Sequence, residues 1–76
     1  MKKIRLKDLL SIASCGFDVW ITNEETEEYF YGYCDKGDAE DLENNDARVL
    51  NAEVKHFNED IIVVYIKDYV DESQQW

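Results

Sequence analysis

The strongest constraint on the fold is an apolar run near the end of the chain that begins at Ile61 and ends at Lys67 (IIVVYIK). A strand that is covered on both faces carries apolar residues without alternation, whereas a half-exposed strand alternates apolar and polar positions. The run is far shorter than the roughly 20 apolar residues that a helix needs to cross a bilayer. The sequence therefore predicts a central strand over 61–67 and no membrane contact.

The spacing of apolar residues near the N-terminus predicts a helix over about 5–15. The i, i+3, i+4, i+7 pattern of a single helix face is followed by Leu6, Leu9, Leu10 and Ala13. Gly16 comes next, at the place where a residue in the left-handed conformation commonly ends a helix. We expect the apolar face of this helix to pack against the strands that follow.

Segments rich in β-branched and aromatic residues predict three further strands, over 17–22, 27–34 and 52–57. The first two are expected to pair as a hairpin, and a tight polar turn over 58–60 leads into the central strand. The segment 35–38 (DKGD) has turn chemistry. Its last residue, Asp38, is placed to cap a short acidic helical turn over 39–42.

These elements predict a single domain over residues 1–76, because a chain of 76 residues has room for one small core. The expected fold class is α+β. An N-terminal helix packs on a curved four-stranded antiparallel sheet, with a short acidic helix or turn between the second and third strands. The same pattern allows one alternative, a partly closed barrel of the SH3 type.

The chain is strongly acidic, and the charge is unevenly distributed. Eighteen acidic residues oppose eight basic ones, and ten of the acidic residues fall between 24 and 46, where Lys36 is the one basic residue. Binding to phosphates needs a basic face, so we expect no direct contact with nucleic acid and instead a basic protein partner. The candidate carboxylates for that contact are Glu24, Glu25, Glu27, Glu28, Asp38, Glu40 and Asp41.

Aromatic residues of the second strand provide the apolar part of the same predicted surface. Strict alternation over 27–34 places Tyr29, Tyr31 and Tyr33 on one face and Phe30, Gly32 and Cys34 on the other. Trp20 is expected to be half-buried beside the tyrosines. Aromatic rings with an acidic rim are typical of protein interfaces, so the three tyrosines are candidate partner-binding residues. The plainer alternative is that tyrosines cover a sheet face because they favour strands.

No combination of residues predicts catalysis, a metal site or a cofactor. Cys15, Cys34 and the lone His56 lack the paired spacing of a zinc site. Lys36 and Gly37 stand where a calcium loop needs ligands. We therefore expect no enzymatic activity, no metal and no cofactor. Two cysteines are too few for a disulfide scaffold and no signal peptide is recognisable, so we expect reduced thiols and a cytoplasmic protein.

Short segments distributed over most of the chain resemble a known group of proteins. They are Ile4-Arg5-Leu6-Lys7-Asp8-Leu9-Leu10, Tyr31-Gly32-Tyr33, and Val49-Leu50-Asn51-Ala52-Glu53-Val54 ahead of Ile61-Ile62-Val63-Val64. In this order they resemble small phage- and prophage-encoded proteins of Gram-positive bacteria. Acidic proteins from such gene neighbourhoods include anti-CRISPR proteins, several of which imitate nucleic acid and block its binding groove on a Cas nuclease. The resemblance assigns no inhibitory residue.

Charge and resemblance together predict a non-enzymatic inhibitor. In this interpretation the protein is an acidic nucleic-acid mimic that docks into the basic groove of a host defence nuclease, such as a Cas nuclease, in the host cell cytoplasm. The alternative is a small structural or adaptor phage protein that forms a homodimer through the aromatic sheet face.

Overall fold

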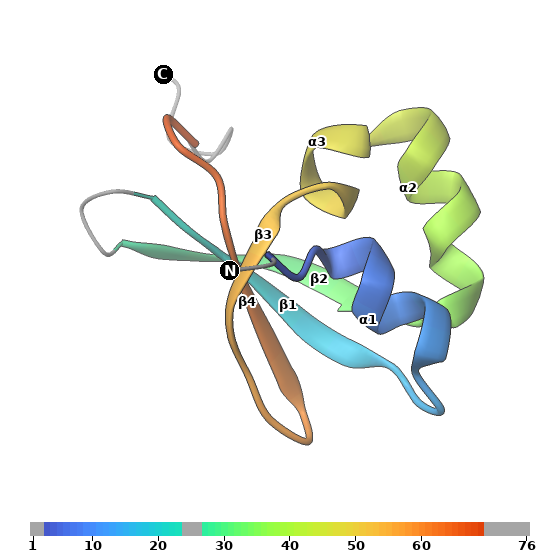
Figure 1. Ribbon diagram of the computed structural model, residues 1–76. Helices are drawn as coiled ribbons and strands as arrows, with labels where there is room; N and C mark the ends of the chain where they lie inside the picture. The colour runs from blue at the N-terminus through green and yellow to red at the C-terminus, as the bar shows by residue number, and fades with distance from the viewer. Residues whose placement is uncertain (1–2, 24–26, 70–76) are drawn as a thin grey trace.

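The computed structural model describes residues 3–23 and 27–69, which form one four-stranded sheet with helices on one face (Figure 1). The helices are α1 (Leu6–Ile12), the 3-10 turn η1 (Lys36–Asp38), α2 (Ala39–Asn45) and α3 (Ala47–Leu50). The strands are β1 (Phe17–Thr22), β2 (Glu28–Cys34), β3 (Glu53–Phe57) and β4 (Ile61–Tyr65). The predicted α+β class is confirmed, and the sheet does not close into an SH3-like barrel. No helix in the described ranges has the length and apolar character needed to span a membrane.

The sheet is mixed, and the prediction that it is antiparallel throughout is wrong at its centre. The strand order is β2-β1-β4-β3, and β1 and β4 run parallel while both outer pairs are antiparallel. Local patterns identify hairpins, but they do not say which strands of two hairpins will meet. The chain leaves β2 at one edge of the sheet and enters β3 at the other. The segment of η1, α2 and α3 therefore carries it across the sheet.

The core lies between the helices and the inner face of the sheet. The central strands contribute four side chains without exposed surface: Val19, Ile21, Ile62 and Val64. The helices add Leu6, Leu10, Leu42, Val49 and Leu50. The apolar run 61–67 is central, as predicted, but helices cover only one of its faces. Val63 (9% exposed) and the half-buried Tyr65 lie on the face without helices.

α1 is shorter than the predicted helix, because the chain is already extended at Ala13 (φ −68°, ψ 134°). Gly16 does not adopt the left-handed conformation predicted for it, since no described glycine has a positive φ. A close contact explains this glycine instead. The ring of Tyr33 lies where a Cβ atom of residue 16 would stand.

Two aspartates hold the turn after β2 by reciprocal hydrogen bonds. Asp35 Oδ1 accepts from the Gly37 N–H (2.8 Å), and Asp38 Oδ2 accepts from the Asp35 N–H (2.7 Å). The prediction that Asp38 caps the following helix is therefore wrong, because its carboxylate points back to Asp35. α2 also extends beyond the predicted turn 39–42, with Leu42 buried against the core.

A β-bulge interrupts β2 at Tyr31. Val19 pairs with Gly32 and Trp20 pairs with Phe30, which leaves Tyr31 as an extra residue between the two pairs. An extra residue shifts the alternation of side chains by one position. Residues after the bulge therefore point to the face opposite to the one that strict alternation predicts.

One hydrogen bond joins the bulge to the helix layer. The Tyr31 hydroxyl donates to Asp46 Oδ2 (2.5 Å) at the junction of α2 and α3. Burial, followed by this hydrogen bond, raises the pKa of the Tyr31 hydroxyl far above its ordinary value, so that the hydroxyl stays protonated and remains a donor.

Replacing Tyr31 by Phe is expected to lower the free energy of unfolding by about 1–3 kcal/mol, because a half-buried carboxylate loses its hydrogen bond. The matched control is Tyr33→Phe, since the Tyr33 side chain is 64% exposed and its change should stay within about 0.5 kcal/mol. Urea denaturation followed by circular dichroism measures both. Equal midpoints for Tyr31→Phe and the wild type would show that the bond adds no stability.

Candidate functional site

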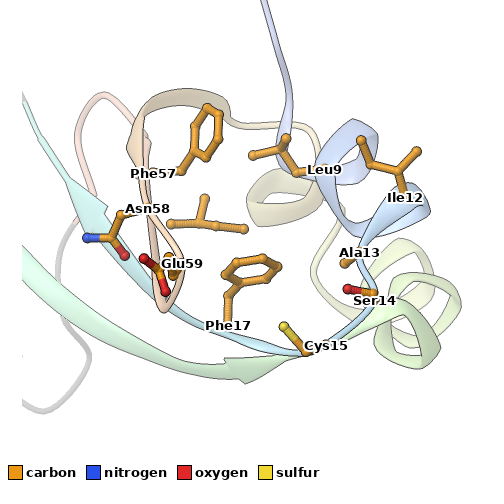
Figure 2. A pocket seen from close by; sticks show the side chains of 10 residues that line it. Leu9, Ile12, Ala13, Ser14, Cys15, Phe17, Phe57, Asn58 and Glu59 are labelled. Atoms are coloured by element: carbon orange, nitrogen blue, oxygen red, sulfur yellow. The ribbon is translucent and has the colours of Figure 1, made fainter.

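An apolar groove opens between α1 and the β3–β4 hairpin, with a volume of about 460 Å³ (Figure 2). Its apolar lining includes Leu9, Ile12, Phe17, Phe57 and Ile62. The polar rim includes Ser14, Asn58 and Glu59. These residues come from α1, the loop after it, β1 and the β3–β4 hairpin. The groove therefore forms only when folding brings residues 9–17 next to residues 57–62.

Two exposed apolar side chains form the walls of the groove. Ile12, at the end of α1, is 78% exposed, and Phe57, at the end of β3, is 51% exposed. The half-buried Phe17 also lines the groove (Figure 2), and so does the buried Ile62. Large exposed apolar residues on both sides of a hollow are typical of a binding surface.

The turn of the β3–β4 hairpin holds the Phe57 wall in place. Asn58 Oδ1 accepts hydrogen bonds from the N–H groups of Asp60 (2.8 Å) and Ile61 (2.9 Å). The Asn58 N–H donates to the Ile61 carbonyl oxygen (2.9 Å). The polar turn predicted over 58–60 is confirmed, and because its own side chain closes it, the wall next to it is preformed.

The groove is suited to an apolar side chain next to a positive charge. Glu59 is the one charged residue in the lining that the structure describes, which contains no lysine, arginine or histidine. Among residues 3–23 and 27–69, no three His, Cys, Asp or Glu side chains are placed to hold a metal ion. A carboxylate beside apolar surface can bind a cationic neighbour of an apolar anchor.

The structure does not bring the three predicted tyrosines together. Tyr31 packs against the core, and Tyr29 is half-buried with its ring centroid 5.4 Å from that of Tyr69. Tyr33, beyond the bulge, lies on the opposite face, and the bulge likewise turns Cys34 into the core. The prediction of a single tyrosine face is therefore wrong, and the extra residue in β2 is the reason.

The predicted carboxylates fall into two groups at opposite ends of β2. Glu27 and Glu28 are exposed where β2 begins, whereas Glu40 and Asp41 are exposed on α2, beyond its other end (Figure 1). A strand of seven residues spans about 20 Å, so the two groups do not share one patch. Of the other predicted residues, Asp38 serves the turn after β2, and Glu24 and Glu25 lie outside the described residues.

The face of the sheet opposite the described helices carries a second set of aromatic residues, and we call it the outer face (Figure 1). Cross-strand pairing and ring contacts place on it Asp18, Trp20, Glu28, Phe30, Tyr33, Glu53, Lys55, Val63 and Tyr65. Trp20 is half-buried, as predicted, but it lies beside Phe30 and on the opposite side of the sheet from Tyr29 and Tyr31. Its ring meets the Phe30 ring edge to face, with the centroids 5.3 Å apart.

The two thiols differ sharply in environment. Cys15 is exposed at the rim of the groove, and Cys34 is buried. Burial, followed by the nearby carboxylates of Asp38, Asp35 and Asp46, raises the pKa of the Cys34 thiol from 9.0 to about 11. Cys34 therefore remains a neutral, apolar core residue at physiological pH.

Comparisons of the chain with protein families, curated proteins and solved structures found no match. The groove is a site that sequence reasoning missed. One signal for it was available in Ile12, an apolar helical residue outside the stripe that α1 buries. The aromatic Phe57 beside a polar turn was the second signal.

Alkylation by iodoacetamide at about pH 8 is expected to label Cys15 quickly, because it is exposed, and to leave Cys34 unlabelled, because Cys34 is buried and its raised pKa keeps it in the unreactive thiol form. Mass spectrometry of peptides measures both. Rapid labelling of Cys34 in the folded protein would contradict its placement in the core.

The raised pKa of Cys34 also predicts how stability changes at alkaline pH. The unfolded thiol ionises near pH 9 and the folded thiol near 11, so its contribution is complete below pH 9 and declines as the pH rises toward 11. Urea midpoints measured on both sides of this window report the decline. A Cys34→Ala control should lack this part of the pH dependence, and an identical decline in the control would assign it to other groups.

Proposed function

We propose that this protein is a non-enzymatic binding protein that docks on a basic protein partner and inhibits it. The observation that carries the proposal is the groove, which combines apolar walls, a carboxylate at the rim and no basic residue in its described lining. It fits a partner segment in which an apolar side chain is followed by lysine or arginine. The formal net charge of −10 adds long-range attraction to a basic surface.

The acidic surface of α2 supports the same kind of partner. Glu40, Asp41 and Glu43 are exposed, while the salt bridges formed among the described residues both involve Glu53. Helical residues three or four apart have Cβ atoms about 5–6 Å apart. This spacing is of the same order as that of phosphates along a DNA strand, about 3.4 Å of rise for each. A partner protein whose own groove binds nucleic acid therefore offers lysine and arginine side chains at intervals that suit these carboxylates.

The resemblance to small phage and prophage proteins narrows the proposed partner further. A Cas nuclease holds its guide and target strands in positively charged channels. We propose that the protein acts in the host cytoplasm as an anti-CRISPR protein that occupies such a channel and does not itself bind nucleic acid.

The groove is tested by titrating the isotope-labelled protein with peptides that carry one leucine or phenylalanine next to lysines. Backbone NMR shifts are expected at Leu9, Ile12 and Phe57. Ile12→Ser and Phe57→Ser should each weaken binding about tenfold, because each removes apolar contact area. The matched control is Ile4→Ser, which alters an exposed isoleucine outside the groove lining.

Matched peptides identify which part of the probe matters. A peptide with serine in place of the leucine or phenylalanine, or with glutamate in place of the lysines, should bind weakly. Shifts confined to α2, or equal binding of the glutamate peptide, would overturn the assignment of the groove to a basic partner.

Reversing two charges on α2 tests the electrostatic part of the proposal. The double change Glu40→Lys and Asp41→Lys is expected to lower the association rate with a purified Cas nuclease about tenfold at low salt, with a smaller change in dissociation. The neutral pair Glu40→Gln and Asp41→Asn should give about half the effect on the logarithm of the rate. Surface plasmon resonance with and without competing DNA measures both. An association that DNA does not reduce would overturn the proposed docking in a nucleic-acid channel.

A further inference from the structure

One half of the outer face already shows a cation held by an aromatic ring and a carboxylate. Lys55 Nζ lies 5.4 Å from the centroid of the Tyr65 ring and 3.5 Å from Glu53 Oε1. Lys3 Nζ reaches the other oxygen of Glu53 at 3.4 Å. Desolvation raises the pKa of Glu53, but the hydrogen bonds and charges of Lys3 and Lys55 outweigh it and hold the pKa below its ordinary value.

The other half of the outer face, formed by β1 and β2, repeats the rings and carboxylates, but neither strand contributes a cation. Asp18 pairs across the strands with Tyr33, and Glu28 lies on the same side of β2 as Phe30. Phe30 and Tyr33 are 54% and 64% exposed. Neither strand contains a lysine, arginine or histidine. Among the residues that the structure describes, the cation–ring contact is between Lys55 and Tyr65, in the other half of the face.

We propose that the β1–β2 half of the outer face binds arginine side chains from an extended basic segment of a protein partner. The guanidinium groups stack on the rings of Phe30 and Tyr33 and pair with the carboxylates of Asp18 and Glu28. Arginine fits this surface better than lysine, because its flat group is weakly hydrated and can stack and form two parallel hydrogen bonds at once. The proposal depends on the proposed function in one respect, the basic character of the partner, and it uses residues outside the groove.

Charge argues against a second copy of the chain as the occupant. A second copy would bring another Asp18 and Glu28 to two strands that carry no cation, and it would add a second formal net charge of −10. A basic segment supplies the missing charge and covers the same rings.

Trp20 offers a direct reading of occupancy, because it contacts Phe30 in this half of the face. The chain has two tryptophans, Trp20 and Trp76, so a Trp76→Phe background makes the fluorescence specific to Trp20. The probes are Gly/Ser peptides that carry several arginines, and matched peptides with lysine or with the neutral isostere citrulline. We expect the arginine peptide to bind most tightly, the lysine peptide more weakly, and the citrulline peptide to cause no change.

Residues of the two halves serve as matched pairs of variants. Phe30→Leu and Tyr33→Leu should each weaken arginine-peptide binding about two- to fivefold, whereas Tyr65→Leu should leave it unchanged, because Lys55 already occupies that ring. Asp18→Asn and Glu28→Gln should weaken binding, and Glu53→Gln should not. Phe30 and Tyr33 are exposed, so their variants are expected to remain folded.

Three results would overturn the proposal. The first is equal binding of citrulline and arginine peptides, or no response of Trp20 to either. The second is a loss with Tyr65→Leu or Glu53→Gln as large as that with Phe30→Leu or Glu28→Gln. The third is a Trp20 signal that changes with protein concentration alone, which would make this face a contact between two copies. Ile12→Ser and Phe57→Ser distinguish a failure of this proposal from a failure of the proposed groove. They should weaken binding of the peptide that carries leucine or phenylalanine next to lysines, and they should leave binding of the arginine peptide unchanged.

Discussion

The bulge at Tyr31 decides how β2 divides its aromatic side chains between the core and the surface. Because one residue is inserted opposite β1, Tyr33 joins Phe30 on the outer face, whereas strict alternation would have placed it with Tyr29 and Tyr31 toward the helix layer. The same insertion turns Cys34 inward, while Tyr31 itself forms the hydrogen bond to Asp46. The pairing of Tyr33 with Phe30 on the outer face and the burial of Cys34 both follow from this irregularity.

The sequence predicted those parts of the fold that short-range patterns encode. The stripe of α1, the strands and the 58–60 turn are all local features, and the structure contains them. The parallel meeting of β1 and β4 depends instead on which apolar faces pack best, and no local pattern records that choice. Local chemistry was also ambiguous where two solutions exist. The Asp38 carboxylate can cap the helix that follows it or accept a hydrogen bond from the N–H of Asp35 before it. A glycine at position 16 can adopt a left-handed conformation or leave room for the ring of Tyr33.

The candidate sites were less accessible to sequence reasoning than the fold. Charge counting identified exposed carboxylates such as Glu40 and Asp41, but it could not show that β2 separates them from Glu28. The groove depends on Ile12 and Phe57, which lie on elements far apart in the sequence, so their proximity appears only in three dimensions. The tyrosine face failed for a different reason, since strict alternation has no means of anticipating an inserted residue.

The borders of the sheet have a consequence for solubility. Along β3, the Val54 N–H donates to the Ile4 carbonyl oxygen, and the backbone of Arg5 forms an isolated antiparallel β-bridge with Glu53. The segment before α1 therefore covers part of that edge of the sheet. Along β2, the bulge and the glutamate at its first position interrupt a regular row of backbone donors and acceptors. Irregular, charged or covered borders are the means by which β proteins oppose stacking into fibrils. This small protein can therefore expose aromatic rings on an open sheet while its edges disfavour pairing with strands of other molecules.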